Sequence, residues 1–330
     1  MRLLLVKLRH IGDALLMTPA VQAVKDAYPD AQIDVIVRAG TESILSGCPS
    51  INKIYTTASP EKSKRSSGVL WKDLRMLAAI RLEKYDAAID LGNNDRGRII
   101  VSLSGAKKRC ANSHLYPIGW PWKFLLTHLG QSEWSIIHRA QADFLNIKDF
   151  IELPQEEPGP QIFKKSHAIE PVIALSSEKP LVIFHPGTRW QRKRWNEKHW
   201  TSLGASLIAQ NYQIIISVGP DPEEIALGQR LVQALGPECI STEGKTQWSH
   251  LAWLLYHSRL FVGVDTAAMH LAAATGTPTV ALFGPDSDAR NWSPWKTPNR
   301  VIHFNSDEVS TLHEVMEAAA GFLARSPLKP

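Results

Sequence analysis

The stretch from residue 261 to residue 285 constrains the fold more than any other part of the chain. Residues 260–264 are apolar and contain a glycine, which is typical of a strand buried in a parallel sheet. Residues 267–275 are mostly good helix formers, and Gly276 followed by Pro278 ends such a helix. The apolar residues after the proline predict the next strand. The stretch therefore predicts an α/β fold with a parallel sheet.

The turn between that strand and helix is a candidate anion site. Asp265 and Thr266 are preferred N-cap residues, and N–H groups at a helix start favour an anion, most often a phosphate. His270 follows Thr266 by about one helical turn, so both side chains can face the same ligand. Two alternatives stay open, because Asp265 can serve only as a cap and His270 can be a structural histidine.

The N-terminus carries a similar strand, turn and helix. Residues 2–8 predict a short strand and residues 10–13 a turn. A helix is expected from about residue 14 to residue 28, with Pro19 as a kink or a restart. Residues 32–38 predict a second strand. The unit looks like half of a nucleotide-binding fold, but it lacks Gly-x-Gly-x-x-Gly, which disfavours a nicotinamide dehydrogenase.

Length and composition bound the class of protein. A chain of 330 residues exceeds one typical domain. Prolines and charges dominate residues 153–179, which we predict to be a linker between a domain of residues 1–152 and a domain of residues 180–330. Three widely spaced cysteines form neither a disulfide framework nor a zinc pattern, which favours a reducing cytoplasm.

The charge balance and the apolar runs indicate possible partners. A net charge of +5 suits phosphorylated lipid, an anionic membrane surface or nucleic acid, and selects none of them. No apolar run is long enough to span a membrane, so we expect any membrane contact to be peripheral. Residues 58–68 are basic and form either a solvated loop or a contact with acceptor phosphates or anionic lipid. Residues 107–109 are a second basic cluster, and the aromatic residues 114–122 can form a mobile lid or an acceptor loop. Residues 92–96 follow a predicted strand, where such folds place ligands.

The second half offers further candidates for phosphate binding. Gly187 and Thr188 form the turn after a predicted strand at residues 181–184. Lys193 lies in a dense run of cations, residues 189–195, which on its own indicates an anion patch of no fixed geometry.

Three acidic residues follow the next predicted strand, at residues 212–218. Asp221 can bind ribose hydroxyl groups there, and Glu223 or Glu224 can do so in its place. All three can equally well complement a helix dipole. The Asp-Ser-Asp triplet at residues 286–288 is interpreted as a loop rather than a metal site.

Three longer motifs connect these turns with a known family. The first is matched by Gly263, Asp265, Thr266, Ala267, His270, Ala272, Ala273, Ala274, Phe283 and Gly284. The second is matched by Lys7, Gly12, Asp13, Leu15, Thr18 and Pro19, and the third, Lys-x-Trp, by Lys193 and Trp195. By these motifs the chain resembles glycosyltransferase family 9, the heptosyltransferases of the bacterial lipopolysaccharide inner core.

The resemblance implies a GT-B fold, with two Rossmann-like domains whose parallel sheets face a central cleft and a terminal helix that packs back on the N-terminal domain. It implies inverting transfer of heptose from ADP-heptose to the inner core. Asp13, which by itself would be interpreted as an N-cap, is then the general base, and Lys193 stabilises the leaving ADP. The expected donor-binding residues are Gly187, Thr188, Lys193, Asp221, Asp265, Thr266, Ala267 and His270. The expected acceptor-binding residues are Arg9, His10, Gly12, Asn93 and Arg96.

The same resemblance implies the partners. They are the nucleotide-sugar donor, the lipid A–core oligosaccharide and the cytoplasmic face of the inner membrane, without nucleic acid. No metal or other cofactor is expected. The early Leu-Val-Lys segment, residues 291–295 and the tryptophan-rich middle look closest to the members that add a third, side-branch heptose. Two alternatives remain: a related transferase that uses another nucleotide sugar on another glycan, and a non-catalytic module that binds anionic ligands, against which Asp13 argues.

Overall fold

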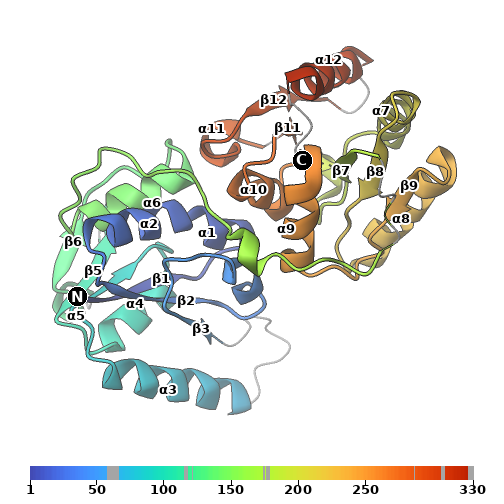
Figure 1. Cartoon of the computed structure of the whole chain (residues 1–330). Helices are drawn as coiled ribbons and strands as arrows, with labels where there is room; N and C mark the ends of the chain where they lie inside the picture. Colours follow the sequence, from blue (N-terminus) through green and yellow to red (C-terminus); the bar gives the residue numbers. More distant parts are fainter. Residues whose placement is uncertain are drawn as a thin grey trace. The chain divides into compact units, whose positions relative to one another are not determined.

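The chain divides into two compact units, Met1–Gly159 and Pro160–Pro330 (Figure 1). The boundary falls inside the segment 153–179 that the sequence predicts as a linker. The computed structural model describes residues 1–57, 67–114, 118–120, 122–173, 175, 179–285, 287–305 and 309–325, and of residues 67–70 the backbone alone.

Unit 1 is built on a parallel sheet. Its six described strands run in the order β3 (Lys53–Thr57), β2 (Gln32–Arg38), β1 (Arg2–Lys7), β4 (Ala87–Asp90), β5 (Lys108–Asn112) and β6 (His128–Gly130). Leu3, Leu4, Leu5 and Val6 of β1 are fully buried. An uninterrupted apolar run of this length suits a strand that is covered on both faces, so β1 lies in the middle of the sheet between β2 and β4.

Helices cover both faces of this sheet (Figure 1). One layer consists of α1 (Ile11–Leu16), α2 (Thr18–Ala27) and α6 (Arg139–Lys148), and the other of α3 (Ser67–Leu82), α4 (Asp95–Leu103) and α5 (Trp122–Leu125). A short 3-10 helix, η1 (Glu42–Leu45), follows β2. The helix predicted from residue 14 to residue 28 is in fact two helices, and Pro19 lies in the first turn of α2, where its missing N–H group costs no hydrogen bond.

Unit 2 has a second parallel sheet. Its six described strands run in the order β12 (Asn299–His303), β11 (Thr279–Phe283), β10 (Ser258–Val264), β7 (Leu181–His185), β8 (Gln213–Ile216) and β9 (Cys239–Ser241). The helices are α7 (Glu197–Ala209), α8 (Pro222–Leu235), α9 (Trp248–His257), α10 (Ala267–Ala274), α11 (Ala289–Trp292) and α12 (Val309–Arg325), with 3-10 turns η3 (Lys165–His167) and η4 (Gln191–Lys193).

The terminal helix α12 buries one face in unit 2. Val315, Ala319 and Leu323 recur every four residues and so form one apolar stripe. That stripe is buried in the core of unit 2, together with Val262 of β10 and Ile302 of β12. The buried face of α12 therefore packs within unit 2, and the expected packing of this helix on the N-terminal domain stays a prediction.

Part of the proline-rich segment packs against unit 2. Phe163 is fully buried, its N–H donates to Ala274 O over 2.9 Å, and its carbonyl accepts from the Tyr256 hydroxyl. Ile169 N–H donates to Ser249 O over 3.1 Å. Residues around Phe163 and Ile169 are thus held by α9 and α10.

Candidate functional site

The candidate residues gather where the strand order of each sheet reverses. In unit 1, β2 and β3 lie on one side of β1, and β4, β5 and β6 lie on the other. In unit 2, β8 and β9 lie on one side of β7, and β10, β11 and β12 lie on the other. The carboxyl ends of strands at such a reversal are where open α/β sheets bind ligands. Lys7 and Asp90 end β1 and β4, and His185 ends β7.

Asp13 lies in the first turn of α1 and is 7% exposed. Its Oδ2 accepts the His10 N–H over 3.1 Å, so the carboxylate satisfies a donor that the helix start would otherwise leave unpaired. Asp13 thus caps the helix start from its third position, whereas the N-cap itself is His10 and not Asp13 as the sequence alone suggested. The contact with His10 leaves the other carboxylate oxygen, Oδ1, available for further chemistry, since a carboxylate accepts several hydrogen bonds.

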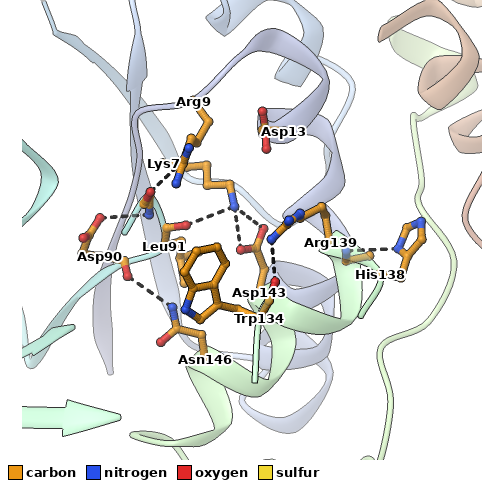
Figure 2. A network of polar contacts seen from close by, with 12 residues as sticks. Lys7, Arg9, Asp13, Asp90, Leu91, Trp134, His138, Arg139, Asp143 and Asn146 are labelled. Carbon is orange, nitrogen blue, oxygen red and sulfur yellow. Dashed lines mark hydrogen bonds and ion pairs between the residues drawn. The ribbon is translucent and has the colours of Figure 1, made fainter. Parts of the chain in front are cut away.

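A buried ion pair joins β1 to α6 in the same region (Figure 2). Lys7 Nζ lies 2.6 Å from Oδ1 and 2.8 Å from Oδ2 of Asp143, and donates to Leu91 O over 3.1 Å. Both side chains are 5% exposed. Burial raises the pKa of Asp143, and the Lys7 ammonium opposes this, while the charge of Asp13 adds to it. Sequence reasoning singled out Lys7 within a motif and missed Asp143.

A second buried carboxylate, Asp90, ends β4 and was also missed. Its Oδ1 accepts the Gly92 N–H over 2.9 Å, whereas its buried Oδ2 has no hydrogen-bond partner among the described residues. Burial raises its pKa to about 6. A Cβ on Gly97 would collide with Oδ1, so that glycine makes room for the carboxylate. An acid at the end of an apolar strand, followed by Leu-Gly-Asn-Asn, was the available signal.

The predicted acceptor residues have different surroundings in unit 1. Arg9 Nε donates to Gly92 O over 2.7 Å, which ties the first turn to the loop after β4. Asn93 has φ +49°, a strained conformation that Asn tolerates better than most residues. Arg96 donates to Asp73 Oδ2 of α3 over 2.7 Å. His10 is exposed at the cap of α1, whose first turn contains Gly12.

In unit 2 the structure brings two predicted donor residues into direct contact. Lys193 Nζ of η4 lies 2.5 Å from Asp265 Oδ2, which follows β10. Gly284 lets the turn after β11 lie close to η4, because a Cβ there would lie 2.9 Å from Arg192 O and 3.3 Å from Lys193 Cα. A cation is thereby held beside the start of α10.

The start of α10 has the features expected of an anion site. Thr266 is its N-cap, and Ala267 is its first residue. The Thr266 Oγ1 atom is buried and has no hydrogen-bond partner among the described residues. A buried hydroxyl group without a partner is costly, so a ligand that accepts from it would be stabilised. His270 is 3% exposed and lies one turn later on α10.

Glu224 approaches the turns at the ends of β7 and β8. Its Oε2 accepts the Gly219 N–H over 2.9 Å, and a Cβ on Gly187 would collide with the same carboxylate. Thr188, the next residue, is 4% exposed. Of the three acids left open by the sequence, Glu224 is the one in contact with a predicted donor turn.

The other two acids have structural partners. Asp221 is exposed and caps α8, since its Oδ1 accepts the Glu223 N–H over 2.9 Å. Glu223 Oε2 accepts from Arg194 over 3.0 Å. At the end of β7, burial lowers the pKa of His185 to about 4, so that imidazole is neutral at physiological pH.

Some sequence predictions fall outside the described residues: the basic loop at 58–66, part of the aromatic loop at 115–117 and 121, and Asp286. Asp288 Oδ1 accepts the Arg290 N–H over 3.0 Å and caps α11. Within the described ranges, no group of three His, Cys, Asp or Glu side chains is arranged as a metal site requires. None of the helices in those ranges is both long and apolar enough to cross a bilayer.

Comparison with known proteins identifies relatives over most of the chain. The model of glycosyltransferase family 9 (heptosyltransferase) matches residues 74–319. Lipopolysaccharide heptosyltransferase 3 of Escherichia coli strain K12 is 29% identical over 315 residues, 93% of this chain and 90% of that protein. Lipopolysaccharide heptosyltransferase 2 of the same strain is 26% identical over 306 residues, 87% of this chain and 84% of that protein.

The fold agrees with solved structures. E. coli heptosyltransferase WaaC with ADP has a TM-score of 0.83 at 20% identity, over 98% of this chain and all of that one. The predicted α/β fold with two Rossmann-like units of GT-B type is thus confirmed. Because the family model spans most of the chain, including Lys193 and the turn at Asp265, the chain belongs to glycosyltransferase family 9, the heptosyltransferases, and is a glycosyltransferase.

Proposed function

We propose that this enzyme transfers a heptose from ADP-heptose to the inner core of lipopolysaccharide. The family supports this, as do the names of the relatives, which are lipopolysaccharide heptosyltransferases 3 and 2. Solved structures of the same fold are titled as complexes with ADP and with ADP-2-deoxy-2-fluoro heptose. The third heptose addition is favoured, because two relatives at 28% and 29% identity are named heptosyltransferase 3.

The contact between Lys193 and Asp265 at the start of α10 carries the donor half of this proposal. The diphosphate would lie against Lys193, the Thr266 hydroxyl group and the first N–H groups of α10. Lys193 would then exchange Asp265 for phosphate and stabilise the charge that builds on ADP as its bond to C1 of the sugar breaks. Gly187 and Thr188 would line the same site, with His270 one turn along α10.

The acceptor half rests on Asp13. Its carboxylate would take the proton of the acceptor hydroxyl group as that oxygen attacks C1 of the donor. Attack from the face opposite the diphosphate inverts the configuration at C1. Arg9, His10, Gly12, Asn93 and Arg96 would contact the acceptor.

No metal cofactor and no nucleic acid belong to this proposal, since Lys193 and the helix start supply positive charge for the diphosphate. A chelator should therefore leave the rate of transfer unchanged. Because the acceptor is anchored in lipid, we propose that the enzyme works peripherally, at the cytoplasmic face of the inner membrane.

The test is a transfer assay with purified enzyme and acceptor from cells that lack this protein. ADP-heptose, UDP-sugars and GDP-sugars are supplied in parallel, and the product is weighed by mass spectrometry. The proposal predicts addition of one heptose from ADP-heptose alone, with inverted anomeric configuration by NMR. Transfer from a UDP- or GDP-sugar alone would contradict the assignment of ADP-heptose as donor. It would favour the alternative, a related transferase that uses another nucleotide sugar.

A further inference from the structure

The helical layer of α3, α4 and α5 in unit 1 exposes large apolar side chains. Trp71 is 72% exposed, Trp120 78% and Phe124 75%. We name this surface the α3–α5 face and define it by Trp71, Leu74, Leu82, Ile99, Trp120 and Phe124. Monomeric soluble proteins rarely expose apolar surface of this kind unless it binds something.

The helix α3 is apolar on two sides. Met76 and Ile80 face the core of unit 1, where they pack with Ile100 of α4. Trp71, Leu74 and Leu82 lie on the remaining, exposed surface of α3. A helix that serves only to cover a sheet needs one apolar stripe, so the second one calls for a partner outside unit 1.

The short helix α5 displays aromatic rings in a similar way. Trp122 packs against the core and anchors the helix. Its neighbours Trp120 and Phe124 point outward and touch each other edge to face, with ring centroids 6.3 Å apart. Two exposed aromatic rings are therefore held on an anchored turn rather than on a loose end.

The charge on the face is positive. Lys72, Arg75 and Lys123 are exposed and have no ion pair among the described residues. The acids on the same helices are neutralised, because Asp73 pairs with Arg96 and Asp95 with Arg98. Tryptophan rings beside unpaired cations are the combination that suits the interface of an anionic membrane.

We propose that the α3–α5 face is the surface by which unit 1 docks on an anionic phospholipid bilayer. Trp71, Trp120 and Phe124 enter the headgroup region, and Lys72 and Arg75 contact lipid phosphates. A second copy of the chain fits less well, because a symmetric pairing would bring the same cations together. The ion pair between Asp73 of α3 and Arg96 of α4 links this face to the loop proposed for the acceptor.

The reason for docking rests on the proposed function, since a lipid-anchored acceptor has to be reached from the membrane. The experiment separates the two. Full-length enzyme is co-sedimented with vesicles of phosphatidylglycerol and phosphatidylcholine, and with vesicles of phosphatidylcholine alone. Transfer to a deacylated, soluble core acceptor is measured on the same preparations.

Two variants test the face, and a third serves as control. The apolar variant is Trp71→Ser/Trp120→Ser/Phe124→Ser, and the charge variant is Lys72→Gln/Arg75→Gln/Lys123→Gln. The control, Ile169→Ser/Val309→Ser, removes side chains of unit 2 that are 53% and 63% exposed.

The wild type and the control are expected to bind the anionic vesicles. The charge variant should lose about fivefold in partition coefficient for each cation removed, and the apolar variant should lose binding to both vesicle types. All four proteins should turn over the soluble acceptor equally.

Equal partition of wild type and both variants overturns the proposal, as does equal binding of the wild type to the two vesicle types. A wild-type dimer that the apolar variant dissociates would assign the face to a second copy. Absence of transfer by the wild type would instead refute the proposed function.

Discussion

Lys7 Nζ lies within 2.8 Å of both carboxylate oxygens of Asp143, although 136 residues separate the two in the chain. The pair fastens α6 to the end of β1, shortly before the turn that carries Asp13. The charge of Asp13 acts on Asp143 as well and opposes its ionisation, while the Lys7 ammonium favours it.

Replacing Asp143 by Asn should destabilise the enzyme by about 3–5 kcal/mol, because it leaves the Lys7 ammonium buried without a counter-charge. Urea unfolding followed by circular dichroism measures this loss. The double variant Lys7→Met/Asp143→Leu should lose less than Asp143→Asn, since no charge stays buried. A loss below about 1 kcal/mol for Asp143→Asn would mean that the ion pair contributes no more than a surface pair.

Asp90 gives the stability a defined pH dependence. Burial raises its pKa from 3.8 to about 6, so the folded state keeps a proton that the unfolded state has already lost. Its contribution is therefore complete below pH 3.8 and is lost as the pH rises through about 6. Asp90→Asn should be more stable than wild type by about 3 kcal/mol above pH 7, and the difference should vanish in acid.

The matched control for this prediction is Asp30→Asn, which alters an exposed carboxylate in the same unit. Its free energy of unfolding should follow that of the wild type at every pH. If the free energies of unfolding of Asp90→Asn and wild type differed by the same amount at every pH, the raised pKa of Asp90 would be contradicted.

Lys193→Ala should lower kcat/KM by about a hundredfold to a thousandfold, because a cation at the diphosphate is lost in the transition state. ADP binding, measured by calorimetry, should weaken as well. Lys198→Ala, which removes an exposed lysine of α7, should leave both quantities unchanged. Normal turnover by Lys193→Ala would show that the contact with Asp265 is structural only.

Glu224 and Asp221 can be told apart by two substitutions. Glu224→Ala should raise the KM for the donor by about tenfold, the value of one hydrogen bond to a charged group. Asp221→Ala should leave that KM unchanged and should cost about 1 kcal/mol of stability, because it removes only the cap of α8. The reverse pattern in steady-state kinetics would assign the nucleoside contact to Asp221.

The sequence predicts the local parts of this structure well. Strand 260–264 and helix 267–275 correspond to β10 and α10 within two residues at each end, and the strand expected after Pro278 is β11. These segments follow from apolar runs, helix-forming residues and the stop at Gly276, all of which act over a few positions. Lys193 and Asp265 were each predicted to bind the donor, and the structure brings them into contact, with β7 and β10 as neighbours in the sheet.

What the sequence does not predict depends on contacts between distant segments. Asp143 looks like any polar residue of a helix until α6 is placed against β1. Glu224 differs from Glu223 only through the rotation of α8, which turns one carboxylate toward Gly219 and the other toward Arg194. Prolines break regular structure whether or not a segment is packed, so the burial of Phe163 was not foreseeable.

The transfer rate of Asp13→Asn tests the central claim most directly. Asn keeps an oxygen that can accept the His10 N–H, but it cannot take a proton, so the helix start should persist while the base is lost. Single-turnover transfer from ADP-heptose to the core acceptor should fall by about a hundredfold to ten-thousandfold, with donor binding unchanged and Asp30→Asn behaving as wild type. Transfer by Asp13→Asn at the wild-type rate would contradict the assignment of Asp13 as the general base.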